Sequence, residues 1–315
     1  MIESANSKIL VLGAGGTGGY FGGRLAQAGV DVSFLVRPAR ATLLRERGLR
    51  IRSPLGDADV PVQVITADEL RDAAPFELVL LSCKAYDLDS AMDAIAPAVE
   101  AGARVLPLLN GLRHYEALDA RFGFANVLGG LCFISATLGA DGEILHLGKP
   151  ASVTFGERDG QPADVRLQSL AAACTQAGID HLHTSDIAQA QWVKYSFLTA
   201  LAAGTCLMRA PIGMIVAGEG GADFMAALYG ECLAVAAATG QSIPDAAQAS
   251  ACDTLTTAGS PMKASMLRDL EAGQRVEAAH IVGDMVHRAA THGIATPYLQ
   301  AAWVHLQAYE AQRPA

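Results

Sequence analysis

An apolar run that breaks into glycines constrains this chain more than any other feature. Residues 8–19 read KILVLGAGGTGG, with Ile9 to Leu12 apolar throughout and Gly13, Gly15 and Gly18 just beyond. An apolar run without alternation is typical of a parallel strand that is buried on both faces. We therefore expect a strand, then a tight turn, then a helix.

The three glycines match the needs of a dinucleotide-binding turn. Gly13 allows the turn, Gly15 lets the backbone approach a pyrophosphate, and Gly18 lets a helix from about Thr17 to Ala28 pack closely on the strand. The N-terminus of that helix offers free N–H groups and the positive end of its dipole to phosphates. We predict that the cofactor contacts Gly13, Ala14, Gly15, Gly16, Thr17 and Gly18.

Arg37 follows a second predicted strand, residues 31–36. NAD-specific members of this fold place an acidic residue at that strand end to bind the ribose 2′-hydroxyl. Arg37, with Arg40 close behind, is suited to a 2′-phosphate instead, so the sequence predicts NADPH/NADP+ over NADH. An arginine that simply solvates the start of a loop is the alternative interpretation.

Two later apolar runs also end at polar side chains. Residues 77–82 lead to Lys84, and residues 104–109 lead to Asn110. Ligands of open α/β sheets bind beyond the carboxyl ends of the strands, so we predict that Lys84 lies where a ligand binds and that Asn110 contacts the nicotinamide ribose or the substrate. A solvated loop cation and an ordinary Asn-Gly turn are the alternatives.

The pattern changes in the middle of the chain. Asp141-Gly142 between apolar segments predicts a hairpin, so we expect the sheet to end in antiparallel strands. Helical composition takes over after Thr184. The fold class expected is α/β, with a Rossmann-like, mostly parallel sheet domain over residues 1–184 and an all-helical domain over residues 185–315. Its helices are expected at about residues 187–203, 219–239, 245–257, 275–292 and 298–312.

No residue pattern indicates a metal site. His181 and His183 resemble a metal-binding pair, but no third ligand with suitable spacing accompanies them. Because residues two apart share one face of a strand, we expect a structural pair.

Composition limits the partners of the chain. Of its 315 residues 51% are hydrophobic and 17% are charged, which is typical of a compact globular protein. The net charge of −9 argues against nucleic acid as a partner. The first seven residues lack the features of a signal peptide, no hydrophobic stretch is long enough for a bilayer, and the six cysteines include no C-x-x-C pair. We therefore expect a reduced cytoplasmic protein with a small-molecule partner and no membrane; a homodimer is left open.

Several motifs occur in a fixed order along the chain. They are GAGGTG, Arg37 after the second strand, SCKAYD around Lys84, LLNGL around Asn110, WVKYS around Lys194, and SMLRDLEAGQRVE from Ser265 to Glu277. Together these motifs resemble the ketopantoate reductase (2-dehydropantoate 2-reductase) family over nearly the whole chain. The resemblance implies NADPH-dependent reduction of a 2-oxo acid to a 2-hydroxy acid. The family reaction, ketopantoate to pantoate, belongs to pantothenate biosynthesis.

The resemblance also implies roles for individual residues. Lys194 matches the catalytic lysine, which donates a proton to the carbonyl oxygen. Glu277 matches a glutamate that helps to position that lysine and the cofactor, and Ser265 matches a serine that binds the substrate carboxylate. Lys84 and Asn110 match residues that line the cofactor and carbonyl site. Without the family pattern, Lys194 is explained as a helix surface charge, Glu277 as part of an exposed ion pair, and Ser265 as a helix cap.

The substrate-binding positions depart from the family. Leu198, Ala202 and Ile212 stand where the family has asparagines, four, eight and eighteen residues after Lys194. The first two share a helical face with Lys194, so the predicted pocket wall is apolar. A buried hydroxyl without a partner costs roughly 1–3 kcal/mol, which favours a 2-oxo acid with an apolar tail. Ketopantoate stays open because its gem-dimethyl group suits an apolar wall. Arg209 is a candidate carboxylate anchor, although capping of the preceding helix explains it slightly better.

Two alternatives remain at the level of sequence. One is a hydroxyacid dehydrogenase of the 3-hydroxyisobutyrate or 6-phosphogluconate type, whose glycine-rich substrate loop is not evident here. The other is a non-catalytic NADPH-binding regulatory protein in which the missing asparagines mark lost activity. The substrate, the pathway and the oligomeric state are not determined by the sequence.

Overall fold

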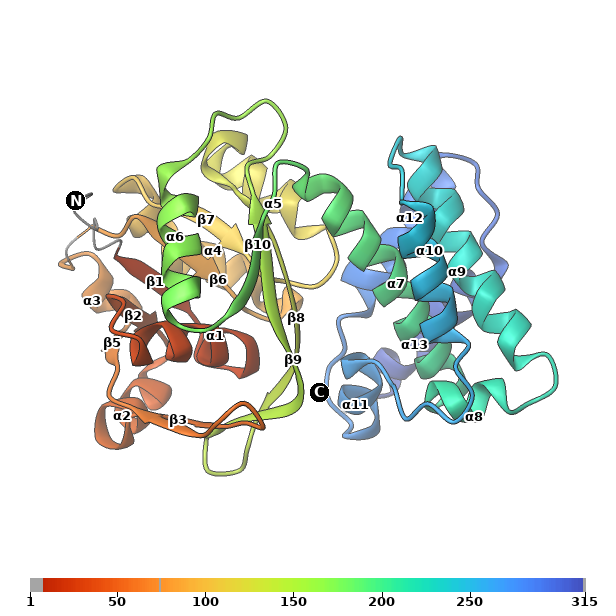
Figure 1. Ribbon diagram of the computed structural model, residues 1–315, viewed down its shortest axis with the longest axis horizontal. Helices are drawn as coiled ribbons and strands as arrows, with labels where there is room; N and C mark the ends of the chain where they lie inside the picture. The colour runs from red at the N-terminus through yellow and green to blue at the C-terminus, as the bar shows by residue number, and fades with distance from the viewer. Residues whose placement is uncertain (1–7, 74, 314–315) are drawn as a thin grey trace. The chain divides into compact units, whose positions relative to one another are not determined.

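The computed structural model describes residues 8–73 and 75–313, which form two compact units. The first unit holds residues up to 109 together with 114–188, and the second holds 110–113 together with the residues from 189 on. Figure 1 colours the chain from red to green through the first unit and from green to blue through the second. The division thus falls after Ala188, and the short segment Asn110–Arg113 belongs with the later residues. The first seven residues, which the signal-peptide prediction concerns, lie outside the described part.

A five-stranded sheet, parallel throughout, organises the first unit. Its strands lie in the order β5-β2-β1-β6-β7, so the chain steps outward from β1 in both directions. This arrangement places a topological switch point beside β1, where α/β sheets bind ligands. β1, β2, β6 and β7 are buried along their whole length, as the apolar runs of β1 and β6 predict; Ser33 of β2 and Arg104 of β7 are also buried. The strands are β1 (Ile9–Leu12), β2 (Val32–Leu35), β5 (Gln63–Ile65), β6 (Leu78–Leu81) and β7 (Arg104–Pro107).

Helical segments lie between and after these strands. The first, α1, spans Gly16–Gln27, close to the predicted residues 17–28. The others are α2 (Pro38–Arg47), α3 (Ala67–Leu70), the short η1 (Ala85–Asp87), α4 (Leu88–Glu100), α5 (His114–Phe122), η2 (Phe124–Asn126) and α6 (Val165–Gln176).

A second sheet, which the sequence did not predict, completes the first unit. The hairpin at Asp141-Gly142 is confirmed, because β8 (Gly129–Leu138) and β9 (Ile144–Gly156) pair antiparallel. The expectation that this hairpin ends the parallel sheet is wrong: β9 pairs instead with β3 and β10 in a separate sheet ordered β10-β9-β3-β4. The remaining strands of this sheet are β3 (Leu49–Arg52), β4 (Ala58–Val60) and β10 (Asp180–His183).

Helix α1 packs against both sheets, which explains its glycine content. A Cβ atom on Gly22 would crowd Phe34 and Val11 of the parallel sheet. A Cβ atom on Gly19 or Gly23 would crowd side chains of the second sheet, Ile144 in the first case and Leu49 and Ile51 in the second. A helix enclosed on two sides needs small residues on both faces, because the backbones approach closely there.

The two histidines of β10 pack on an aromatic ring. His181 and His183 are half-buried, and their rings lie 6.2 Å and 5.6 Å from that of Phe155. His183 Nε2 also lies 3.0 Å from Glu157 Oε2. Among residues 8–73 and 75–313, no group of three or more side chains is arranged to hold a metal ion. These contacts fit the structural pair that the sequence predicts.

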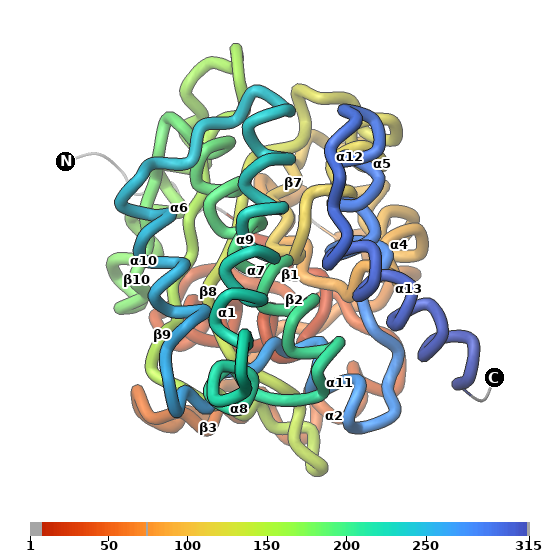
Figure 2. Tube along the Cα trace, turned by 90° about the vertical axis from the view of Figure 1, so that its right-hand side faces the viewer, coloured from red at the N-terminus to blue at the C-terminus, as the bar shows by residue number. Residues whose placement is uncertain are grey.

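The second unit is helical, as expected. Figure 2 shows α7 and α9 side by side, and a Cβ atom on Gly204 of α7 would crowd Met225 of α9. The expected helix at 275–292 is wrong in its first half, because a π-helix occupies residues 279–283 and residues 275–277 are not helical. The elements are α7 (Ile187–Met208), α8 (Ile212–Val216), α9 (Gly221–Ala238), α10 (Asp245–Leu255), α11 (Ser265–Glu271), the π-helix η3 (Ala279–Gly283), α12 (Asp284–Thr291) and α13 (Pro297–Gln312).

An apolar core fills this helical unit. Met225, Met266 and Met285 are buried in it. By length and composition alone, α9 is also apolar enough to cross a bilayer. Core helices of folded domains pass the same test, and six residues of α9 are buried in this core.

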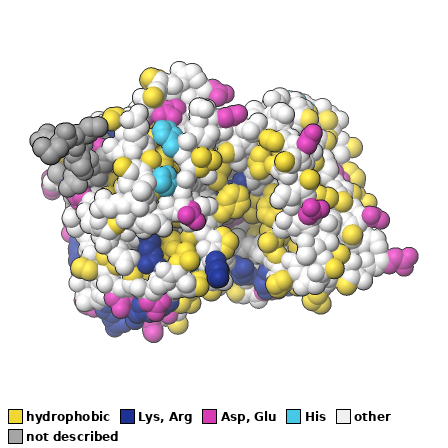
Figure 3. Space-filling model, viewed as in Figure 1, with side chains coloured by type: hydrophobic (Ala, Val, Ile, Leu, Met, Phe, Trp, Pro, Cys, Tyr) yellow, Lys and Arg dark blue, Asp and Glu magenta, His cyan; other side chains and the backbone are white. Residues whose placement is uncertain are grey.

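On the face seen in Figure 3, basic side chains stand among acidic and hydrophobic ones.

Candidate functional site

Polar and glycine residues gather at the carboxyl edge of the parallel sheet. Gly13 follows β1 directly, Arg37 comes two residues after β2, and Ser82 to Lys84 follow β6. Since β2, β1 and β6 are neighbours and parallel, these residues share one edge. Ser82 Oγ donates to Leu12 O over 2.8 Å, which ties the ends of β1 and β6 together.

The glycine turn has the geometry that its sequence predicts. Gly13 has φ +90°, a conformation that favours glycine, and its N–H donates to Leu35 O. A Cβ atom on Gly18 would collide with Ser82 Oγ and Gly13 O, so α1 approaches the strands as closely as a glycine allows. At Gly15, by contrast, no described side chain or backbone atom from elsewhere in the fold lies within 4 Å of the Cβ position. The space in front of Gly15 is therefore open to a ligand.

The start of α1 is suited to a phosphate group. Gly15 is its N-cap, has no side chain to satisfy the first N–H groups, and is followed by a first turn without an acidic residue. Such a helix end presents unsatisfied donors and a positive dipole end. The open space at Gly15 and this helix end together fit the pyrophosphate of a dinucleotide.

Gly16 and Arg40 have roles that the sequence did not reveal. A Cβ atom on Gly16 would collide with the carbonyl group of Ala136 in β8, so Gly16 lets the second sheet cross the start of α1. Arg40 was expected to assist Arg37 at a 2′-phosphate. Its guanidinium instead donates to Ala14 O over 3.0 Å and to Gly142 O over 2.8 Å, and burial, together with Arg50, lowers its pKa. Arg40 therefore holds the glycine turn against the hairpin tip.

Arg37 remains accessible, but it has an acidic neighbour. Its side chain is 79% exposed, and Nη2 lies 3.2 Å from Asp87 Oδ1. An exposed ion pair of this kind contributes about 0–1 kcal/mol, so a phosphate can displace Asp87 from Arg37. Asp87 would at the same time repel that phosphate. Asp87 belongs to the SCKAYD motif. Because it lies 50 residues after Arg37 in the chain, the sequence did not indicate that the two side chains meet.

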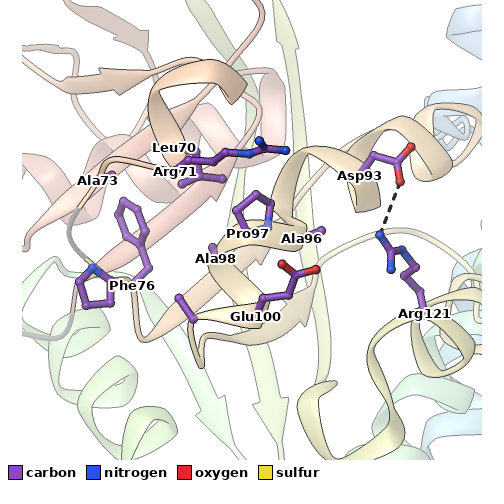
Figure 4. A pocket seen from close by; sticks show the side chains of 12 residues that line it. Leu70, Arg71, Ala73, Phe76, Asp93, Ala96, Pro97, Ala98, Glu100 and Arg121 are labelled. Atoms are coloured by element: carbon purple, nitrogen blue, oxygen red, sulfur yellow. Dashed lines mark ion pairs between the residues drawn. The ribbon is translucent and has the colours of Figure 1, made fainter.

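Lys84 lies half-buried between β6 and η1, at the edge that the sequence predicts. A separate cavity of about 410 Å³ opens at the other end of β6, around Phe76, which precedes that strand. Figure 4 shows its lining by α3 and α4 and the pair Arg121–Asp93, 3.9 Å apart, at its rim. None of the predicted site residues lines this cavity, which lies toward the amino end of the strand.

The second unit brings Lys194 and Asn110 together. Lys194 Nζ donates to Asn110 Oδ1 over 3.0 Å, although 84 residues separate them in the chain. Lys194 is only 8% exposed, so the interpretation as a helix surface charge is wrong. Buried lysines are rare unless they are paired. Asn110 follows β7 in the chain, yet its segment packs with the helices of the second unit.

Glu277 and Ser265 lie in the same unit. Glu277 is 9% exposed, which rules out the exposed ion pair, and its carbonyl oxygen accepts the N–H groups of His280 and Ile281 at the start of η3. Ser265 is the first residue of α11 and is exposed, while Ala264 is the N-cap. The alternative in which Ser265 caps this helix is therefore wrong.

The three apolar substitutions differ in accessibility. Leu198 is half-buried, whereas Ala202 and Ile212 are completely buried in the apolar core of the second unit. Only Leu198 of the three therefore offers accessible surface to a substrate in this conformation. Arg209 has φ +55° directly after α7 and is exposed, which fits the helix-terminating role.

Comparisons with known proteins agree with the motifs. Residues 9–160 match the family "Ketopantoate reductase PanE/ApbA", and residues 186–310 match "Ketopantoate reductase PanE/ApbA C terminal". The uncharacterized oxidoreductase YkpB of Bacillus subtilis (strain 168) is 38% identical over 306 residues, 97% of this chain and 100% of that protein.

Solved structures extend the comparison. That of 2-dehydropantoate 2-reductase from Geobacter metallireducens GS-15 is 30% identical with a TM-score of 0.86, over 96% of this chain and 99% of that one. D-mandelate dehydrogenase, solved with NADH and anilino(oxo)acetate, is 21% identical with a TM-score of 0.85, over 96% and 98%. At that identity the second likeness concerns the fold alone.

Proposed function

Because this chain belongs to the ketopantoate reductase family of oxidoreductases, we propose that it reduces a 2-oxo acid to a 2-hydroxy acid with NADPH. The observation that carries the proposal is the hydrogen bond from Nζ of the buried Lys194 to Oδ1 of the half-buried Asn110. The asparagine amide oxygen holds the lysine Nζ, with its N–H donors, in a defined position. Such a donor is what a carbonyl oxygen needs as it gains negative charge.

The residues of this chain divide the reaction between them. When bound, NADPH supplies a hydride to the carbonyl carbon. The residues proposed to hold it are the turn from Gly13 to Gly18, Arg37 and Lys84, with contributions from Asn110 and Glu277. The hydride forms a C–H bond as the C=O π bond breaks, and Lys194 donates a proton to the oxygen, which completes the hydroxyl group. Ser265 is proposed to bind the substrate carboxylate, and Glu277 to help position Lys194.

We expect Arg37 to decide the cofactor preference. Arg37→Ala should weaken NADPH binding by roughly tenfold to a hundredfold, because it removes a charged contact to the 2′-phosphate, and leave NADH binding unchanged. Asp87→Asn is the matched variant: it removes the competing carboxylate and should strengthen NADPH binding. Titration of cofactor fluorescence measures both. Equal affinities of the wild type for NADPH and NADH would contradict the preference. The comparison is needed because D-mandelate dehydrogenase, which has a similar fold, was solved with NADH.

The apolar side chain of Leu198 favours a substrate tail without a hydroxyl. Ketopantoate and 3,3-dimethyl-2-oxobutanoate differ only in that the first carries a hydroxyl where the second has a hydrogen. We expect a kcat/KM for the second acid that is roughly 5- to 150-fold higher, since an unpartnered hydroxyl costs about 1–3 kcal/mol. Leu198→Asn should narrow or reverse this ratio.

Oxidation of NADPH against a panel of 2-oxo acids containing this pair tests the proposal as a whole. If ketopantoate is preferred, the role in pantothenate biosynthesis follows and the apolar-tail proposal fails. Tight NADPH binding with no turnover of any acid would support a regulatory protein instead. A cytoplasmic location is proposed because the six cysteines are widely spaced and include no C-x-x-C pair. A homodimer is to be tested by light scattering.

A further inference from the structure

Two aromatic residues beside Lys194 link α7 to α12. The Tyr195 hydroxyl lies 2.8 Å from Asp284 Oδ2 and 3.0 Å from Ile281 O, and the side chain is completely buried. A phenol has one proton, which these two acceptors share. Burial and the charge of Asp284 raise the pKa of Tyr195 well above its ordinary value, so the hydroxyl stays a donor.

Arg288 contacts the same oxygen atom of Asp284 as Tyr195 does. Arg288 Nε donates to Asp284 Oδ2 over 2.9 Å, and its guanidinium lies 5.7 Å from the centre of the Trp192 ring. The rings of Trp192 and Tyr195 are themselves 5.6 Å apart. These contacts join four side chains in a ring, in which each one contacts the next: Trp192, Arg288, Asp284 and Tyr195. The ring fixes the rotation of α7 at Lys194. A carboxylate buried to this degree needs such partners.

The same turn of π-helix also supports Asn110. Gly111 lies against His280 O so closely that a Cβ atom would collide with it, and Arg113 Nη1 lies 3.4 Å from Ala279 O. The next carbonyl, that of Ile281, faces Tyr195. Three consecutive carbonyl groups of η3 therefore contact the Asn110 segment on one side and the Lys194 helix on the other. π-Helical turns are often found at functional sites.

We propose that Tyr195 and Asp284 are positioning residues, which hold η3 against α7 and so bring Asn110 within hydrogen-bond distance of Lys194. This inference rests on the proposed function of Lys194. Neither side chain touches the reacting atoms; both act through Lys194. The sequence places the two residues 89 positions apart, and only the fold joins them.

Tyr195→Phe tests this linkage without a substrate. The variant keeps the ring and removes the hydroxyl, so η3 loses its tie to α7. Amide hydrogen exchange should become at least about tenfold faster in residues 111–113 and 279–283. Tyr229→Phe is the matched control, because Tyr229 is equally buried and, within residues 8–73 and 75–313, its hydroxyl has no hydrogen-bond partner. Unchanged exchange in both segments of the Tyr195 variant would overturn the linkage.

Kinetics then separate positioning from mere stability. Tyr195→Phe should lower kcat about tenfold with little change in KM or in the Kd for NADPH, and it should have no further effect in a Lys194→Ala background. Asp284→Asn, which keeps an acceptor for the hydroxyl, should retain more activity than Asp284→Ala. An equal loss in the Lys194→Ala background would show that Tyr195 does not act through Lys194. Full activity of Lys194→Ala would instead overturn the proposed function, while the exchange result would still decide the linkage.

Discussion

Replacing Lys194 by alanine is expected to lower kcat by about 10²- to 10⁴-fold, the range for loss of a positioned general acid. The Kd for NADPH should stay unchanged, because the proposed phosphate contacts lie at Gly13 to Gly18 and at Arg37. Among the described lysines, only Lys194 is both buried and hydrogen-bonded to Asn110, so no other lysine with this geometry can replace it as the proton donor. Steady-state NADPH oxidation with the best acid of the panel measures kcat, and cofactor fluorescence measures binding.

Two further experiments give this result its meaning. Lys149→Ala, which removes an exposed lysine of β9, should leave kcat unchanged. A small primary amine added to Lys194→Ala should restore part of the rate, since it can supply the missing proton donor. Turnover by Lys194→Ala within about tenfold of the wild type would remove Lys194 from the mechanism and leave the reduction without its assigned acid.

The sequence predicted the parallel sheet well because its information there is local. β1 and β6 are short apolar runs buried along their whole length, and Gly13, Gly15 and Gly18 mark the turn between strand and helix. The second sheet depends on distant pairing instead. Ile51 of β3 pairs with Ile144 of β9, 93 residues later, and no local pattern records that partnership.

The same distinction applies to the candidate site. Lys194 and Asn110 were predicted separately, from a resemblance and from a strand end, but their hydrogen bond depends on the Asn110–Arg113 segment packing with the second unit. The π-helix was missed because it inserts one residue into an otherwise ordinary helical pattern. Its local signals are its last residue, Gly283, which faces the Trp303 ring, and the buried Asp284 that follows it.

Arg40 shows where position along the chain misleads. Arg37 and Arg40 both follow β2 and were expected to serve one phosphate. One turn of α2 separates them, so Arg37 faces solvent beside Asp87 while Arg40 faces the carbonyls of Ala14 and Gly142. The residue type was right for an anion in both cases, but only the fold decides which guanidinium is accessible.

Asp164→Ala is expected to lower the free energy of unfolding by roughly 3–5 kcal/mol, the typical effect of removing one partner of a buried ion pair. Arg104 and Asp164 are each 8% exposed, and Arg104 Nη1 donates to Asp164 Oδ2 while Nη2 donates to Gln161. Asp164 Oδ1 also accepts the Arg166 N–H over 2.8 Å at the start of α6. The alanine variant therefore leaves a buried guanidinium without its counter-charge and a helix without its cap.

The pH dependence of this loss identifies its cause. Burial alone would raise the pKa of Asp164, but the bonds from Arg104 and the Arg166 N–H outweigh burial and hold it below its ordinary value of 3.8. A lowered folded pKa means that the pair stabilises the protein fully above pH 3.8 and loses its effect as the pH falls through the lower value. Urea unfolding should thus separate the midpoints of wild type and variant widely at neutral pH and less in strong acid.

Two control variants accompany this measurement. Asp59→Ala, which breaks an exposed pair with Arg52, should shift the urea midpoint little. Arg104→Met combined with Asp164→Leu should recover much of the lost stability, because neither charge of the pair remains buried. A gap between wild type and Asp164→Ala that stays constant down to strong acid would show that the helix cap, and not the ion pair, accounts for the loss.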